Sequence, residues 1–193
     1  PPLNKAQRSR KDLFVSYMQE YISSFRDTSL TPRMPSSPGV RRFVNIDQAW
    51  KTGFEWNWYQ EIGWGLRHQT GIAFTYAQDL ERREPLPEIA PMDFRYTLSG
   101  NFLDGRVQPE ITFRHVLEQS RISEEYGESV TPSFSLFHIK LASVLTRRIR
   151  FSAGVNNLFD VAYYEHLSRP VRGSARPIYE PGRSFFGSFY LTF

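Results

Sequence analysis

The stretch D-Q-A-W-K-T-G-F-E-W-N-W, residues 47–58, contains the clearest indication of the fold. From Trp50 onward, tryptophan, threonine and phenylalanine occupy its even positions, whereas lysine, glycine, glutamate and asparagine occupy its odd positions. Successive side chains of a β-strand point to opposite faces of the sheet, so a period of two predicts a strand. One face of this strand is rich in rings, and the other is small or polar.

The same alternation recurs along the chain and predicts an all-β fold of about eight strands. Seven further segments show it, although the first is less regular than the others because both of its parities are partly apolar. These segments are 13–25, 63–77, 92–102, 107–114, 137–142, 149–156 and 184–193. A length of 193 residues is typical of one domain.

The composition excludes several classes of protein. The chain has no cysteine, which removes disulfide frameworks, thiolate metal sites and thiol nucleophiles. A net charge of only +4 gives little support for a nucleic-acid partner. No G-x-S-x-G or related nucleophile motif is convincing, so we expect neither an enzyme nor a bound cofactor.

The ring-rich face predicts contact with lipid. The inner face of a soluble β-sandwich is usually aliphatic, and its outer face carries most of the charge. On the lipid side of a membrane barrel, Arg or Lys costs about 2–4 kcal/mol at the midplane, and rings are favoured at both rims. We therefore expect a transmembrane antiparallel β-barrel. His68 fits this face poorly, although the alternation places it there.

The connections between the expected strands alternate in length. Outer-membrane barrels combine long extracellular loops with short periplasmic turns, so we expect the long loops outside the cell and the C-terminus in the periplasm. Asp104-Gly105 is a strong hairpin signal because both central residues of a type I′ turn need positive φ. The long connections are 26–41, 78–91, 118–133 and 158–183, and the short ones are 59–62, 104–105 and 146–147.

Three stretches resemble TonB-dependent outer-membrane receptors. The closing segment 151–193 contains G-V-N-N-L-F-D, then P-G-R and a terminal Phe193, as that family does. V-N-I-D-Q-A-W-K-T-G-F-E-W-N-W at 44–58 and P-L-P-E-I-A-P at 85–91 are similar to two earlier family segments. Y-Y-E-H-L at 163–167 is similar to receptors of Bacteroidetes type in the copper-associated branch.

The resemblance implies a 22-stranded barrel with a plug domain inside it. We expect residues 1–193 to be the C-terminal segment of such a barrel, with the plug absent from this chain. The implied function is uptake of a scarce metal chelate, such as a ferric siderophore, haem or a copper complex, energised by the TonB system. The implied partners are the TonB complex, the barrel-assembly machinery, outer-membrane lipids and lipopolysaccharide.

Candidate ligand contacts gather in the longest loop. An imidazole beside a carboxylate can bind a metal, and arginines can clamp an anionic chelate. The alternative is a solvated loop tip whose rings lie at the membrane rim. The candidates are Tyr163, Tyr164, Glu165, His166, Arg169, Arg172 and Arg176.

Three other groups of residues have less specific interpretations. By the resemblance, Phe193 is an assembly signal, and ordinary packing against lipid is compatible with that role. His138 and Glu118 supply too few ligands for a closed metal site, so no metal site is expected. Acidic residues of 124–128 either hold a divalent cation that bridges lipopolysaccharide or are solvated.

Two other folds remain open from the sequence. A standalone eight-stranded barrel, acting as an adhesin, an anchor or a lipid enzyme, predicts that segment 13–25 pairs with segment 185–193. A soluble β-sandwich lectin predicts that the ring-rich faces are buried between two sheets.

Overall fold

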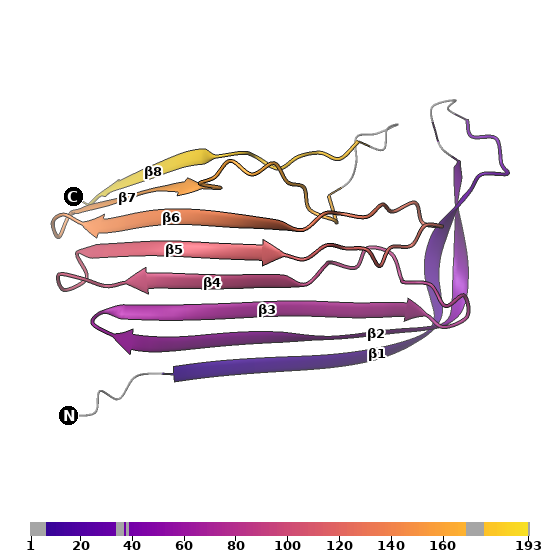
Figure 1. Cartoon of the computed structure of the whole chain (residues 1–193), viewed down its shortest axis with the longest axis horizontal. Helices are drawn as coiled ribbons and strands as arrows, with labels where there is room; N and C mark the ends of the chain where they lie inside the picture. Colours follow the sequence, from indigo (N-terminus) through magenta and orange to yellow (C-terminus); the bar gives the residue numbers. More distant parts are fainter. Residues whose placement is uncertain (1–6, 34–36, 38, 169–175, 193) are drawn as a thin grey trace.

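The computed structural model describes residues 7–33, 37, 39–168 and 176–192. These form one antiparallel sheet of eight strands, in which each strand pairs with its neighbours in chain order (Figure 1). The predicted all-β class and the predicted number of strands are confirmed. The strands are β1 (Gln7–Asp27), β2 (Val40–Gly63), β3 (Leu66–Asp79), β4 (Asp93–Gly100), β5 (Val107–Val116), β6 (Phe134–Val144), β7 (Ile149–Asn156) and β8 (Ser184–Leu191). The described part of the chain holds no helix suited to crossing a membrane.

The strand register places most of the apolar rings on one face of the sheet. Phe54 lies opposite Leu13 of β1 and Phe74 of β3. Farther along, the Phe113 ring centroid is 4.8 Å from that of Phe137, so rings also touch across β5 and β6. The described residues form a single sheet with no second sheet over this face. The β-sandwich alternative is therefore wrong.

Two rings on β2 mark the height of this apolar face. Trp50 and Trp58 lie on the same face and are eight residues apart, which is about 27 Å along a strand. A strand tilt of ~40° reduces this separation to a height of ~20 Å. That height is close to the ~25 Å apolar band of outer-membrane barrels, which is flanked by rings at both rims.

His68 lies on the ring-rich face, as its parity predicts, and the surrounding side chains cover it. Its ring packs edge-on against Trp58 with centroids 4.6 Å apart, and it also lies 5.7 Å from the Tyr96 ring. His68 Nε2 is 3.2 Å from Gln60 Oε1, and the residue is only 9% exposed. Neighbouring rings therefore separate this polar group from the surface of the face.

The opposite face is small, polar or charged, and glycines on it make room for two rings. A Cβ atom at Gly53 would collide with the Phe14 ring and the Phe74 carbonyl. A Cβ atom at Gly154 would collide in the same way with the Phe186 ring and a carbonyl of β6. Each ring thus occupies the space that a side chain at the neighbouring glycine would need.

The sheet is open at both edges within the described residues. β1 pairs only with β2, and β8 pairs only with β7. The pairing of segment 13–25 with segment 185–193, which a closed eight-stranded barrel requires, is absent. This alternative is therefore wrong for the chain as described, and two strand edges remain available for pairing.

One of the three predicted short turns lies elsewhere. We expected a turn at 59–62, but β2 continues to Gly63, and the turn is formed by Trp64 and Gly65. Both residues have positive φ, 53° and 74°, as a two-residue type I′ turn requires, and Gly65 adopts such a φ at no steric cost. The turn at Asp104-Gly105 is confirmed by positive φ at both residues.

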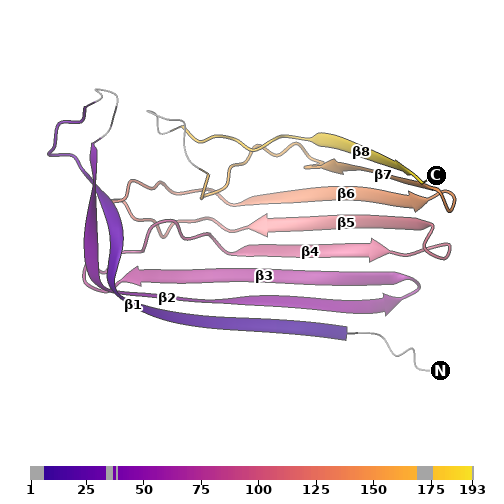
Figure 2. The same ribbon diagram turned by 180° about the vertical axis from the view of Figure 1, so that it is seen from behind.

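The long connections all lie at one end of the sheet, and the short turns, the start of β1 and the end of β8 lie at the other (Figures 1 and 2). The buried apolar side chains also gather at the loop end. One cluster joins Ile46 and Ala77 to Leu86 of the second long loop, and another joins Val116, Phe134 and Leu136. The last part of β1 and the first part of β2 bend out of the sheet and run across its loop end (Figure 1). The best-packed region of the molecule is therefore its loop end.

Candidate functional site

An ion triad fastens the last long loop, 157–183, to the polar face of the sheet, which lies opposite the ring-rich face and is the inner face. Arg114 of β5 places Nη2 2.7 Å from Asp93 Oδ2 and Nη1 2.5 Å from Glu165 Oε1. Its guanidinium also lies 5.5 Å from the centre of the Phe134 ring. Charge-assisted hydrogen bonds of this kind are about twice as strong as neutral ones. Glu165, a predicted ligand contact, therefore serves to hold the loop.

His166 fastens the same loop to the neighbouring loop, 117–133. Its Nδ1 is 2.9 Å from Thr131 Oγ1, and its Nε2 is 3.6 Å from Glu128 Oε1. The His166 side chain is only 3% exposed. Both ring nitrogens thus face groups of the protein, and the imidazole does not lie at a solvated loop tip.

The Glu128 carboxylate joins three of the long loops. It accepts the backbone N–H of Glu88 in loop 80–92 at 2.6 Å and that of Ser123 in its own loop at 2.9 Å, besides facing His166. Burial by itself raises the pKa of the Glu128 carboxyl, but His166 and the two N–H donors outweigh burial and hold that pKa below its ordinary value. The ionised form is therefore built into the loop packing.

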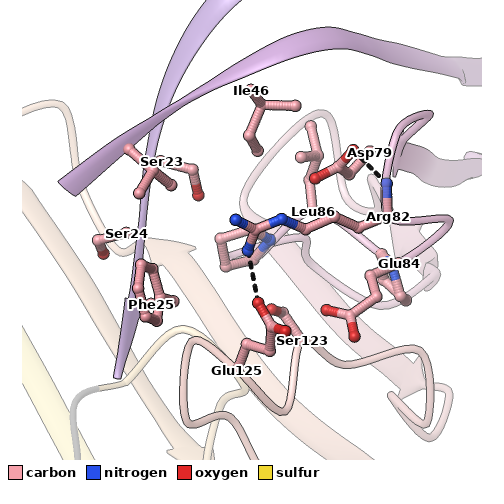
Figure 3. Close-up of a pocket in the computed structure, with 13 residues that line it drawn as sticks. Ser23, Ser24, Phe25, Ile46, Asp79, Arg82, Glu84, Leu86, Ser123 and Glu125 are labelled. Carbon is pink, nitrogen blue, oxygen red and sulfur yellow. Dashed lines mark hydrogen bonds and ion pairs between the residues drawn. The ribbon is translucent and has the colours of Figure 1, made fainter. Parts of the chain in front are cut away.

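The pKa of a second carboxyl in the same group of loops shifts in the opposite direction. Burial, followed by repulsion from Glu125, raises the pKa of the Glu84 carboxyl, and Arg82 opposes this only in part. Figure 3 shows Glu84 beside a small hollow between the loops and the β1–β2 hairpin. At this hollow the Arg82 guanidinium pairs with Glu125, and the Arg82 backbone N–H donates to Asp79. The hollow has a volume of about 20 Å³. That is enough for one water molecule and too little for a metal chelate.

These opposite shifts give a prediction about pH. Glu128→Gln is expected to loosen the contact between loops 117–133 and 157–183 at neutral pH. The loosening relative to the unsubstituted protein is complete above the ordinary carboxyl pKa of 4.5, and it vanishes as pH falls through the lowered pKa of Glu128. The measurement is the distance between spin labels at Ser129→Cys and Leu167→Cys, two exposed positions on those loops.

Glu84→Gln is the matched control for this experiment. The stabilising contribution of Glu84 is complete below its ordinary pKa and is lost as pH rises through the raised pKa. Removing the charge of Glu84 is therefore expected to leave the distribution of label distances at neutral pH as narrow as in the unsubstituted protein, or narrower. If the distribution of label distances broadens equally in both variants, Glu128 has no specific role in holding loops 117–133 and 157–183 together.

The other predicted site residues are partly brought together. Tyr163 packs on Phe134, with ring centroids 4.6 Å apart, and Tyr164 packs edge-on against Tyr179 at 5.6 Å. Arg176 is exposed on the returning branch of the loop. Arg169, Arg172 and Phe193 lie outside the described residues.

Of the acidic group at 124–128, Glu124 and Glu125 are exposed, as the solvated interpretation predicts, although Glu125 also pairs with Arg82; Glu128 is instead held by protein groups. Within the described ranges, His, Asp and Glu side chains do not converge in threes that could hold a metal ion. His138 instead contacts Asn156, with Nδ1 3.3 Å from Oδ1.

Sequence reasoning missed the structural role of the G-V-N-N-L-F-D segment. Asn157 is 2% exposed and has a φ of 51°, and its side chain both accepts from Val161 N and donates to Val161 O at 2.9 Å. Asp160 Oδ1 accepts the N–H of Arg183 at 2.7 Å, so the start of the long loop is tied to its end. Asn157 and Asp160 were the available signal, because asparagine and aspartate tolerate positive φ and their side chains form hydrogen bonds with nearby backbone groups in turns.

Known structures with the same fold are found, whereas no family model matches the sequence and no curated protein does. The copper transporter OprC superposes with a TM-score of 0.84 at 22% identity, covering 97% of this chain and 29% of its own. The ferric enterobactin receptor PfeA of Pseudomonas aeruginosa gives 0.68 at 17% identity, covering 96% of this chain and 29% of its own. The chain has the fold of the matching part of a TonB-dependent receptor barrel.

A third receptor-barrel structure agrees with this assignment. The ferric-catecholate import receptor Fiu of E. coli K12 gives a TM-score of 0.68 at 15% identity, over 97% of this chain and 25% of its own. The chain thus spans about 29% of the length of the copper transporter. The resemblance that the sequence motifs indicated is confirmed at the level of the fold, and these neighbours are named as transporters and receptors rather than as enzymes.

Proposed function

We propose that the chain forms part of the barrel wall of an outer-membrane receptor that takes up a metal chelate. The observation that carries this proposal is the superposition on the copper transporter over 97% of the chain with a TM-score of 0.84. The exposed ring-rich face supports it, because such a face suits hydrocarbon. The packed loop end supports it as well, because recognition by barrels resides in their long loops.

The sidedness follows from this proposal. The long loops face the exterior, while the short turns and the C-terminus face the periplasm. Residues 1–193 supply wall strands and four outer loops, and a plug within the completed barrel receives force from the TonB complex. The barrel-assembly machinery reads Phe193, and outer-membrane lipids, with lipopolysaccharide in the outer leaflet, surround the ring-rich face.

The proposed ligand surface is the outer side of loop 157–183. Tyr164 and Arg176, with Arg169 and Arg172, are offered as its contacts. Tyr163, Glu165 and His166 act on the ligand through the position of the loop, because they contact Phe134, Arg114 and Thr131. Copper complexes are the first ligands to test, since the TM-score with the copper transporter exceeds the 0.68 found with PfeA.

The test is metal accumulation in cells with and without the whole protein that contains this chain. Cells receive labelled copper, ferric enterobactin or haem under limitation for that metal. We expect accumulation from one of the three to fall to background when the protein is deleted and to return on complementation. Loss of TonB is expected to have the same effect. Equal accumulation of all three in the deleted strain would contradict the proposed function.

A further inference from the structure

Arg121, in loop 117–133, lies on the ring-rich face at the loop end of the sheet. Its guanidinium carbon is 3.9 Å from the centre of the Tyr76 ring. Its Nη2 donates to Gln78 Oε1 at 2.8 Å, and the Tyr76 hydroxyl donates to the same oxygen at 3.2 Å. Tyr76 and Gln78 share the face that carries Trp50, whose ring lies 5.3 Å from that of Tyr76. The cation is thus held beside the rings of Trp50 and Tyr76 at the loop end, which form the outer ring belt in the proposed orientation.

A ring and an amide oxygen hold this guanidinium, but no carboxylate pairs with it. The ion pairs of the described residues do not include Arg121. Stacking on a ring leaves the edge of a guanidinium free for bidentate hydrogen bonds to an anion. Arg121 is exposed, and among the described contacts only Nη2 of its guanidinium donates to a protein acceptor. An anion therefore meets a donor whose conformational entropy is already reduced.

An apolar hollow adjoins the cation. It has a volume of about 170 Å³, and Tyr76 and Arg121 lie on its border. The hollow exists because β3 and β4 pair only as far as Ala73 and Asp93, so the end of β3 has loop residues as neighbours. Its apolar lining includes Phe74, Ile89, Pro91, Met92 and Leu117. Glu118 also lines it but forms no ion pair with Arg121 among the described residues.

A cation above an apolar hollow matches an amphiphile with a phosphorylated head. At the proposed depth of the outer ring belt, the molecules that meet this surface are lipids of the outer leaflet. A soluble anion would satisfy the guanidinium but would leave the hollow without an occupant. The combination favours a lipid over a free anion.

We propose that Arg121, with Tyr76 and the adjoining hollow, binds a phosphorylated lipid of the outer leaflet. The phosphate accepts hydrogen bonds from the guanidinium, and an acyl chain covers the hollow. This inference rests on the proposed location in the outer membrane, but it does not depend on which metal chelate the receptor takes up.

The test uses the whole protein, purified from outer membranes in dodecyl maltoside and titrated with bisphosphorylated lipid A. Native mass spectrometry reads the fraction of protein that carries lipid. Arg121→Gln is expected to weaken binding about tenfold, since it removes the charge and the bidentate donors. The matched control is Arg83→Gln, which removes an exposed arginine at the same end of the sheet. Heat-modifiable migration in gels confirms that both variants fold.

Two further arms identify the source of the phosphate. Lipid A stripped of its phosphates is expected to bind wild type and Arg121→Gln with equal, low affinity. Millimolar inorganic phosphate is expected to leave the bound lipid in place, and displacement of the lipid would overturn the lipid assignment in favour of a free anion. Equal binding of bisphosphorylated lipid A by Arg121→Gln and wild type would also overturn the inference. A protein that does not fractionate with outer membranes would instead refute the proposed function.

Discussion

Replacing Arg114 with methionine is expected to release loop 157–183 from the inner face of the sheet. The substitution keeps an apolar side chain next to Phe134 but leaves the Asp93 and Glu165 carboxylates unpaired and close together. Removing one member of a fully buried pair costs about 3–5 kcal/mol. The Arg114 side chain is 18% exposed and its partners are 29% and 31% exposed, so the carboxylates are partly solvated. We expect a cost of ~2 kcal/mol, most of it in docking of the loop.

The measurement is hydrogen exchange in segment 163–168, which is expected to become faster in the Arg114→Met variant while the centres of the strands stay protected. The matched control is Arg95→Met. Arg95 lies directly opposite Arg114 on the same face and is exposed. Fast exchange in both variants, or in neither, would show that the ion triad does not hold the loop.

The Arg114 result also bears on the proposed uptake of ligand. If Glu165 and His166 act through the position of the loop, Arg114→Met lowers metal accumulation although Arg114 touches no ligand. Restoring neutrality with Asp93→Asn and Glu165→Gln in the same chain is then expected to recover part of the docking, because no buried charge is left unpaired.

The strands were predictable from the sequence because their signal is local. Alternation in 47–58 fixes which residues of β2 share a face, and the register confirms it for Trp50, Phe54 and Trp58. The same rule placed His68 on the ring-rich face, although that position was unfavourable for a histidine. The position of the β2–β3 turn was not predicted. Trp64 continues the alternation of rings, so the glycines on either side of it, Gly63 and Gly65, were interpreted as part of a strand.

The loop contacts were not predictable because they join residues far apart in the chain. Nothing near His166 indicates that its partners are Thr131 and Glu128, and nothing near Glu165 indicates Arg114. The sequence showed an imidazole beside a carboxylate, which is equally typical of a metal ligand and of a structural contact. Only the folded arrangement of the loops separates these roles.

Placing an arginine at Ile72 is expected to destabilise the protein strongly, whereas the same change one residue later is tolerated. Ile72 lies on the ring-rich face between Trp56 and Phe94, midway along the apolar part of β3. An arginine there would cost about 2–4 kcal/mol if that face meets the bilayer midplane. Ala73→Arg is the matched control, because Ala73 faces inward between Glu55 and Asp93. Urea unfolding of the whole protein in lipid vesicles measures both costs.

Contact between the ring-rich face and hydrocarbon can be measured with nitroxide labels placed one at a time from Thr70 to Tyr76 on β3, using the whole protein in lipid vesicles. The chain contains no cysteine of its own to take up label. We expect labels at even positions to collide with dissolved oxygen, which concentrates in lipid, and labels at odd positions not to do so. The reverse pattern, with even positions accessible to a water-soluble nickel complex, would show that the ring-rich face meets water and not lipid.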